Sequence, residues 1–193
     1  MRTASELVER LGKERELRRT AVAKLRAGGA GDPQVVAAFD DGWLLEDAEW
    51  ARCAGDAAKL ATRVKADAEG RVAVVDLSAF KGVKELPASV GKLQALRKLN
   101  LSACLGLTSL PAELGQLQAL TELYLGDCRG LTSLPAELGQ LRALTVLLLS
   151  SCSGLTSLPD LSGLEELKVR HLPAKLQPWA EGGRKAFALP PQA

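Results

Sequence analysis

The residues of this chain best suited to catalysis or metal binding are its four cysteines and its single histidine, His171. Three of the cysteines, Cys104, Cys128 and Cys152, recur at intervals of 24 residues. Thiols can ligate metals, form disulfides or act as nucleophiles, but ligand pairs in zinc sites are usually only about two to four residues apart. This spacing does not fit a metal site. We therefore expect structural thiols, with no metal and no other cofactor.

A disulfide is not expected either. Neighbouring strands of a sheet lie about 4.8 Å apart, so distance alone would allow a bond between cysteines on adjacent strands. However, side chains at equivalent positions of a ladder point the same way, and residues 1–19 are too charged to form the apolar core of a secretion signal. We expect a cytoplasmic protein whose cysteines are reduced, buried and slow to react with thiol reagents.

Sequence motifs of the common enzyme classes are absent from the chain. It has no glycine-rich dinucleotide motif, no phosphate-binding loop and no recognisable Ser–His–Asp set. His171 lies close in sequence to Glu165 and Glu166, which could form an acid–base pair with it. A single histidine on an outer strand is usually an ordinary surface residue, so we predict that the chain is not an enzyme.

The cysteines belong to a repeat that determines the predicted fold. Residues 107–130 and 131–154 are consecutive 24-residue blocks, nearly identical over their first fifteen positions. A looser copy occupies residues 83–106, and a shortened one begins at residue 155. A fixed period in this range indicates a solenoid, in which each unit buries its apolar side chains against its neighbours.

Each block predicts a short strand, a turn and a short helical segment. The strand contains Leu-x-Leu, as at Leu123 and Leu125, and its period of two places both leucines on one face. Pro111 ends the preceding extended segment and suits the first turn of a helix. Leu114 is then expected to face inward, and Gly115 suits a left-handed C-terminal cap.

The pattern LxxLxLxxCxxLxxLPxxLGxL resembles the 24-residue form of the leucine-rich repeat family over roughly residues 71–173. The resemblance implies an α/β solenoid with a curved parallel sheet and an N-terminal helical cap. It places five parallel strands near residues 72–77, 97–101, 121–125, 145–149 and 165–169. The family usually has asparagine where this chain has cysteine, and Phe80 takes that position in the first unit. Its members typically bind proteins on the concave face of the sheet, which implies a partner protein here.

The side chains that flank the strand leucines are expected to leave the sheet on its solvent side. The candidate protein-binding residues are Lys98, Asn100, Glu122, Tyr124, Asp127, Val146, Leu148 and Lys168. Tyr124, Val146 and Leu148 form an apolar patch among them, and aromatic residues often contribute most at interface centres. In the alignment of repeats, Lys168 continues the column of Tyr124 and Leu148. A solvated face without a ligand remains the alternative, because scattered exposed apolar residues are common.

The repeat divides the chain into three regions: a helical cap or subdomain at 1–70, leucine-rich repeats at 71–173, and a C-terminal cap and tail at 174–193. The first region has apolar residues at helical spacing, and its third helical stretch runs from residue 44 to about residue 65. Trp179 is expected to close the far end of the leucine core. Alternatively, the N-terminal helices are a pairing surface, and the chain self-associates through them with the repeats as a scaffold.

Composition and charge exclude several other classes of protein. The net charge is +2 and no long run of like charge occurs, so no nucleic acid partner is predicted. No apolar stretch reaches the roughly 18 residues of a membrane-spanning helix, so no membrane partner is predicted. We predict a protein–protein interaction module with an unidentified protein partner. Family analogy adds a role as a regulatory part of a larger signalling protein.

Overall fold

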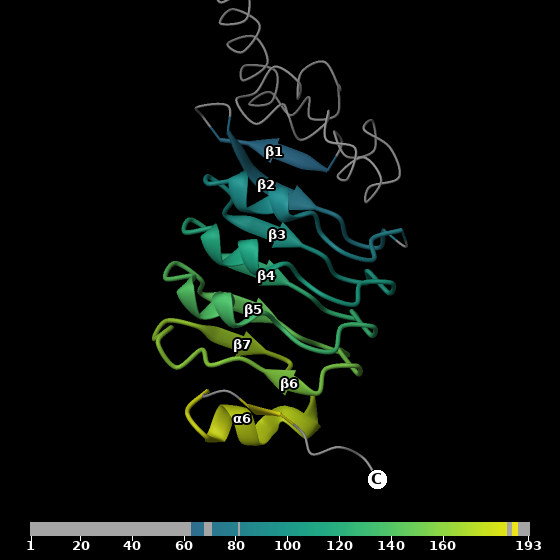
Figure 1. The fold of residues 1–193 in the computed structure, drawn as a ribbon, viewed down its shortest axis with the longest axis vertical. Helices are drawn as coiled ribbons and strands as arrows, with labels where there is room; N and C mark the ends of the chain where they lie inside the picture. The colour runs from purple at the N-terminus through teal and green to yellow at the C-terminus, as the bar shows by residue number, and fades with distance from the viewer. Residues whose placement is uncertain (1–62, 68–70, 81, 185–186, 189–193) are drawn as a thin grey trace, which may run out of the picture.

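The computed structural model describes residues 63–67, 71–80, 82–184 and 187–188. Within them the chain forms a stack of coils, each built around one short strand (Figure 1). The complete repeats add one 3₁₀ helix each. This stack is the solenoid that the 24-residue period predicts. The helices predicted before residue 63 lie outside the described residues.

All five strands predicted from the repeat are present. They are β2 (Val72–Asp76), β3 (Lys98–Asn100), β4 (Glu122–Tyr124), β5 (Val146–Leu148) and β7 (Lys168–Arg170). They pair in parallel and in this order. From β3 to β5 each strand lies 24 residues after the last, which aligns Leu99, Leu123 and Leu147. The prediction of a parallel sheet built from Leu-x-Leu is confirmed.

The last parallel strand departs from the predicted register. The aligned leucines predict that Lys168 lies beside Leu148, but in the structure Lys168 pairs with Val146 and Arg170 pairs with Leu148. That part of the prediction is wrong. A shift of two residues leaves the same side chains facing the core, because strand side chains alternate with a period of two. The apolar pattern alone therefore could not fix this register.

Three further strands lie at the ends of the stack. β1 (Val64–Ala66) pairs antiparallel with β2, so the helix predicted to about residue 65 is wrong at its last residues. At the other end, β6 (Ser157–Leu158) pairs antiparallel with β8 (Phe187–Ala188). None of these pairings carries the Leu-x-Leu signal of the repeat, which is why the sequence did not reveal them.

A short helix and a tryptophan close the C-terminal end of the core. The 3₁₀ helix η4 (Ala174–Leu176) leads into α6 (Gln177–Glu181), which lies below the last coil in Figure 1. The Trp179 side chain is only 1% exposed, and its indole nitrogen Nε1 donates a hydrogen bond to the carbonyl of Pro159 at 3.0 Å. The prediction that Trp179 closes the leucine core is confirmed.

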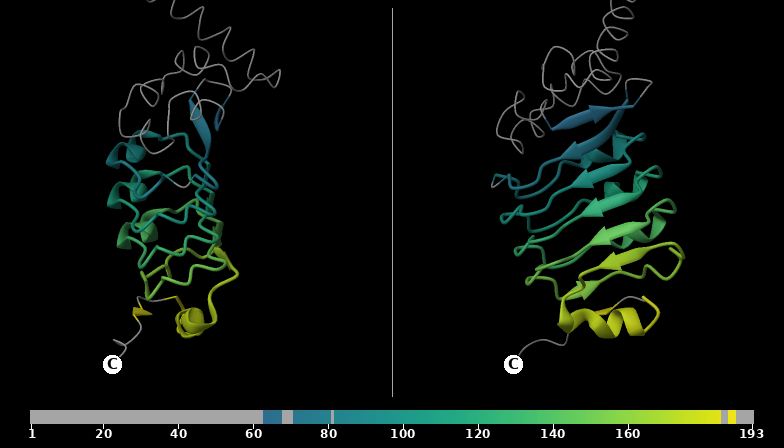
Figure 2. Two further views of the ribbon diagram at one scale, coloured as in Figure 1. Left: turned by 90° about the vertical axis from the view of Figure 1, so that its right-hand side faces the viewer. Right: turned by 180° about the vertical axis from the view of Figure 1, so that it is seen from behind.

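In each complete repeat, the segment after the proline is a 3₁₀ helix on the side opposite the strands, as the left view of Figure 2 shows. These helices are η1 (Ala88–Lys92), η2 (Ala112–Gln116) and η3 (Ala136–Gln140). Each follows a proline whose backbone is extended. Because the proline ring fixes φ, it sets the angle at which the chain enters the helical turn.

The repeat glycine has a different role from the predicted left-handed cap. Gly115 lies inside η2, and Gly183 is the only glycine of the described residues with positive φ. A Cβ atom on Gly115 would lie 2.6 Å from the carbonyl oxygen of Glu137 in the next coil. A Cβ atom on Gly139 would lie 2.7 Å from the carbonyl oxygen of Asp160. Glycine is therefore needed here for the close approach of successive coils.

The coils are joined by an apolar core and by repeated hydrogen bonds. One cluster of buried side chains, mostly leucines, extends from Val64 to Trp179. Beside it, the Thr121 hydroxyl donates to the Arg97 carbonyl at 2.9 Å, and the Thr145 hydroxyl donates to the Thr121 carbonyl at 3.1 Å. Both bonds join residues 24 apart, so each coil repeats the contacts of the one before it.

We predict that Gly115→Ala lowers the free energy of unfolding by about 1–3 kcal/mol, because the new methyl group overlaps the backbone of the next coil. Gly163→Ala is the matched control, since its Cβ would meet only the end of the Arg142 side chain, at 3.2 Å. The control should change stability by no more than about 0.5 kcal/mol. Urea unfolding followed by circular dichroism measures both. Equal midpoints for Gly115→Ala and the parent chain would contradict the packing role of this glycine.

Candidate functional site

The candidate site is the solvent side of the parallel sheet, which we call the strand face. In β3, β4 and β5 the central residue is buried and the residues on either side of it point outward. The first outward column consists of Val74, Lys98, Glu122, Val146 and Lys168. The second column consists of Asp76, Asn100, Tyr124, Leu148 and Arg170. These two columns define the strand face.

All the candidate residues from the sequence lie in these columns except Asp127. That residue lies in the turn after β4, where its φ is 58°, and its carboxylate is 3.7 Å from the guanidinium of Arg129. Asp127 therefore borders the strand face. Arg170 was not among the candidates, because the alignment of leucines gave β7 the wrong register. In the observed register, the exposed Lys168 lies beside Val146 and the exposed Arg170 lies beside Leu148.

Lys98, Glu122 and Tyr124 contact one another on neighbouring strands. The Lys98 ammonium lies 3.0 Å from Oε2 of Glu122, and the Tyr124 hydroxyl donates to the same oxygen at 2.9 Å. The ammonium also lies 4.6 Å from the centroid of the Tyr124 ring, which is a cation–π contact. These contacts hold the tyrosine ring at both its hydroxyl and its face.

The electrostatics of this cluster keep both ionisable groups charged. The pKa of Lys98 is raised, chiefly because its ammonium donates a hydrogen bond to Glu122. The pKa of Glu122 is lowered, first by that bond and then by the hydrogen bond from Tyr124. Both shifts favour the charged forms, so neither group is set to exchange a proton near neutral pH. The two charges also offset each other within the strand face.

Polar side chains at the ends of β2 and β3 are used by the fold. Oδ1 of Asn100 accepts a hydrogen bond from the backbone N–H of Ser102 at 3.0 Å, and Oδ1 of Asp76 accepts one from the N–H of Ser78 at 2.9 Å. Such bonds stabilise the turn that follows the strand. Burial acts to raise the pKa of Asp76, but the bonds from Ser78 and the charge of Arg63 lower it overall.

The apolar part of the strand face lies on β4 and β5. Tyr124 and Leu148 pair directly across the two strands, and Val146 is the other outward residue of β5. All three side chains are half-buried. The patch of Tyr124, Val146 and Leu148 expected from the sequence is therefore continuous across two strands. On its other side it meets the two cations of β7.

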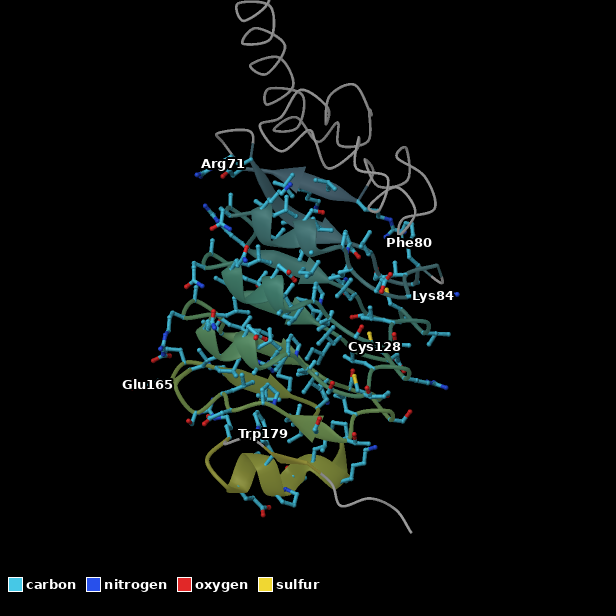
Figure 3. The ribbon with its side chains drawn as sticks, viewed as in Figure 1. Arg71, Phe80, Lys84, Cys128, Glu165 and Trp179 are labelled. Carbon is cyan, nitrogen blue, oxygen red and sulfur yellow. The ribbon has the colours of Figure 1, made fainter. Side chains whose placement is uncertain are left out.

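The three repeat cysteines lie in the interior of the stack. Cys104, Cys128 and Cys152 are 0% exposed and form no disulfide. Each thiol donates to a carbonyl of the preceding coil, and the acceptors are Leu77, Leu101 and Leu125 at 3.1, 3.2 and 2.9 Å. Figure 3 shows the sulfur atoms one above another around Cys128. The prediction of a buried, unbridged ladder is confirmed.

Other chemical groups on the described part of the chain are dispersed. There, no cluster of three or more His, Cys, Asp or Glu side chains is placed to hold a metal ion. His171 is exposed, and no ion pair joins it to Glu165 or Glu166 in the residues that the structure describes. Among the residues that the structure describes, there is no apolar helix of membrane-spanning length.

The cysteine ladder predicts a loss of stability in alkali. Burial raises the pKa of the Cys128 thiol to about 12 and that of Cys152 to about 11, against 9.0 for an ordinary thiol. Above about pH 9 the unfolded thiols ionise while the folded ones stay protonated. Stability from this source is thus complete below that pH and is lost as pH rises towards 11–12, by at most about 1.4 kcal/mol per pH unit for each thiol.

Urea unfolding at several pH values from about 8.5 to 10.5, with a reductant present, measures this loss. A Cys128→Ala, Cys152→Ala variant should lose less stability than the parent over this range, because it lacks these two buried thiols. The tyrosine and lysine titrations are common to both proteins and cancel in the comparison. Parallel stability–pH curves for the two proteins would show that the buried thiols do not contribute.

A sequence model of the leucine-rich repeat region matches residues 72–188. A search of curated proteins gave no significant match. Among solved structures, the chain resembles the leucine-rich repeat domain of the type III effector XopL, with 27% identity over 51% of this chain and 37% of that one, and a TM-score of 0.44.

Two structures from Arabidopsis thaliana are also similar. The BIR3–SERK2 complex gives 23% identity over 56% of this chain and 60% of that one, with a TM-score of 0.39. The BIR2 ectodomain gives 22% identity over 55% and 58%, with a TM-score of 0.40. The chain thus spans between 37% and 60% of the length of these three structures. Because the sequence model covers more than half of its residues, the chain belongs to the leucine-rich repeat family.

Proposed function

We propose that this chain is a protein–protein interaction module whose strand face contacts a partner protein. Leucine-rich repeat domains typically mediate protein–protein interaction. The observation that carries the proposal is the continuous patch of Tyr124, Val146 and Leu148, bordered by charged side chains. An apolar centre containing an aromatic residue and surrounded by polar groups has the composition of a protein interface.

The two near-identical repeats support this assignment. Blocks 107–130 and 131–154 differ at Gln118/Arg142, Glu122/Val146, Tyr124/Leu148, Gly126/Ser150, Asp127/Ser151 and Arg129/Ser153. Most of these differences fall in the strand and the turn after it, whereas every framework leucine is unchanged. The fold therefore tolerates variation where side chains face outward, which allows that surface to be matched to a partner.

The contacts of Tyr124 favour binding for a second reason. Its hydroxyl is held by Glu122 and its ring by Lys98, so its orientation is already limited before a partner arrives. Ordering a side chain on binding costs roughly 0.5–1.5 kcal/mol, and a ring that is held in advance avoids part of that cost.

We further propose that the chain lies in the cytoplasm, has no enzymatic activity of its own and is a regulatory part of a larger signalling protein. The alternative is an assembly module that acts through residues 1–70, with the repeats as scaffold. The two proposals differ in which surface a partner needs, so variants of the strand face separate them.

We predict that Tyr124→Ala weakens partner binding by about 2 kcal/mol or more, which is about 30-fold, with little loss of stability. Leu123→Ala should instead lower the free energy of unfolding by roughly 2–5 kcal/mol, because Leu123 is 0% exposed. Affinity capture with the intact chain, followed by calorimetric titration of the captured protein, measures binding. Urea unfolding measures stability.

A double Tyr124→Ala, Leu148→Ala variant gives the decisive comparison. Leu105→Ala is its matched control, because Leu105 is 49% exposed in a turn outside the strand face. The control should keep the partner and the double variant should lose it. Undiminished affinity in the double variant would exclude the strand face and move the interface towards residues 1–70.

A further inference from the structure

The charges of the strand face are compensated at one end and uncompensated at the other. Lys98 is paired with Glu122, and Asp76 accepts a hydrogen bond from Ser78 with Arg63 close by. On β7 the arrangement differs. Within the described residues, no acidic side chain forms an ion pair with Lys168 or Arg170. Both cations are exposed to solvent.

The register of β7 places these cations directly against the apolar patch. Lys168 pairs with Val146, and Arg170 pairs with Leu148. Adjacent strands lie about 4.8 Å apart, so each cation is within reach of a ligand atom that rests on its apolar neighbour. Two apolar side chains and two cations thus form one contiguous surface, half apolar and half basic.

We propose that the strand face binds an acidic segment of a partner protein that carries an exposed apolar side chain. The apolar side chain rests on Val146, Leu148 and the ring of Tyr124. Carboxylates next to it in the partner reach Lys168 and Arg170, where the guanidinium can donate two parallel hydrogen bonds to one carboxylate. This inference rests on the proposed function and specifies the chemical class of the partner.

Charge complementarity favours an acidic protein segment over a nucleic acid. Two cations are few for a phosphate backbone, whose binding usually draws on about six to ten phosphate contacts. Glu165, at the left edge in Figure 3, and Glu166 are exposed on the loop that leads into β7, and their charges limit how far a polyanion could extend past the two cations. An acidic segment of protein can place a few carboxylates on β7 and still bury an apolar side chain.

The two cations also have a simpler possible role. β7 is the last strand of its sheet, and lysine and arginine on an edge strand hinder unwanted pairing with another chain. If that is their only role, removing them should cause self-association and leave ligand binding unchanged. Sedimentation velocity of the same variants therefore tests this role directly.

The probe is a hexapeptide, Glu-Asp-Leu-Trp-Asp-Glu, labelled with an uncharged fluorophore and blocked at both ends so that all its charge comes from side chains. Its neutral counterpart is Gln-Asn-Leu-Trp-Asn-Gln, and its counterpart without apolar residues is Glu-Asp-Ser-Ser-Asp-Glu. Fluorescence anisotropy with the intact chain measures binding at about 50 and about 300 mM NaCl, since screening shortens the range of charge interactions. We expect only the first peptide to bind well, and less tightly at the higher salt concentration.

The variant Lys168→Ser, Arg170→Ser should weaken binding of the acidic peptide roughly five- to thirty-fold at low salt. Lys84→Ser, Lys92→Ser is the matched control, because it removes the same charge from exposed positions outside the strand face, one in a turn and one in η1. The control should bind like the parent chain. Leu148→Ser should also weaken binding, which would confirm that the apolar and basic parts act together.

Three results would overturn the proposal. The neutral peptide could bind as tightly as the acidic one, or the Lys168→Ser, Arg170→Ser variant (the β7 variant) could bind the acidic peptide as tightly as the parent chain does. The third is that a single-stranded oligonucleotide binds these residues more tightly than the acidic peptide and displaces it. Failure here is distinguishable from failure of the proposed function. If Tyr124→Ala, Leu148→Ala loses the captured partner while the β7 variant keeps both partner and peptide, only the acidic class is wrong. If Tyr124→Ala, Leu148→Ala keeps the partner, the strand face itself is excluded.

Discussion

No coil of this protein can bury its own leucines, and the rest of the structure follows from that constraint. Each parallel strand is short, and an inward side chain such as Leu123 is enclosed by Leu99 on one side and Leu147 on the other. The sheet must therefore be parallel and in register. The coils must also approach closely on the opposite side, where Gly115 and Gly139 leave no room for a side chain. A stack held in this way needs a closed end, which Trp179 provides.

The same constraint leaves the outward side chains free to vary. Since the core contacts only one side of each strand, the strand face can carry a charge pair, an aromatic ring, aliphatic side chains and exposed cations without loss of the fold. The contacts among Lys98, Glu122 and Tyr124 limit the orientations of the tyrosine ring in the middle of that face. Rigid anchors flanked by adaptable charged side chains combine affinity with selectivity, because an unmatched partner leaves a charge or an apolar surface unsatisfied.

Much of this could be predicted from sequence, because the period of 24 and the alternation within Leu-x-Leu act locally. They predict which of Leu123 and Tyr124 faces inward. They do not fix the β7 register, since a shift of two residues satisfies the same alternation. The role of Gly115 depends on the backbone of Glu137 in the next block, and the cation–π contact of Tyr124 depends on Lys98 in the previous one. Both require the distance between coils, which a one-dimensional pattern does not contain.

The constant advance of 24 residues from β3 to β5 bears on how such a protein can change over generations. A duplicated block inserted between these strands meets matching leucines, threonines and glycines on both sides, so neither end of the molecule has to adapt. Each insertion lengthens the sheet by about 4.8 Å and adds one pair of outward positions. The shortened last block and its shifted strand offer no such match, so growth is confined to the interior. The length of the sheet and the chemistry of its outward side chains can therefore evolve separately. The length changes by whole repeats, and the side chains change by point substitution.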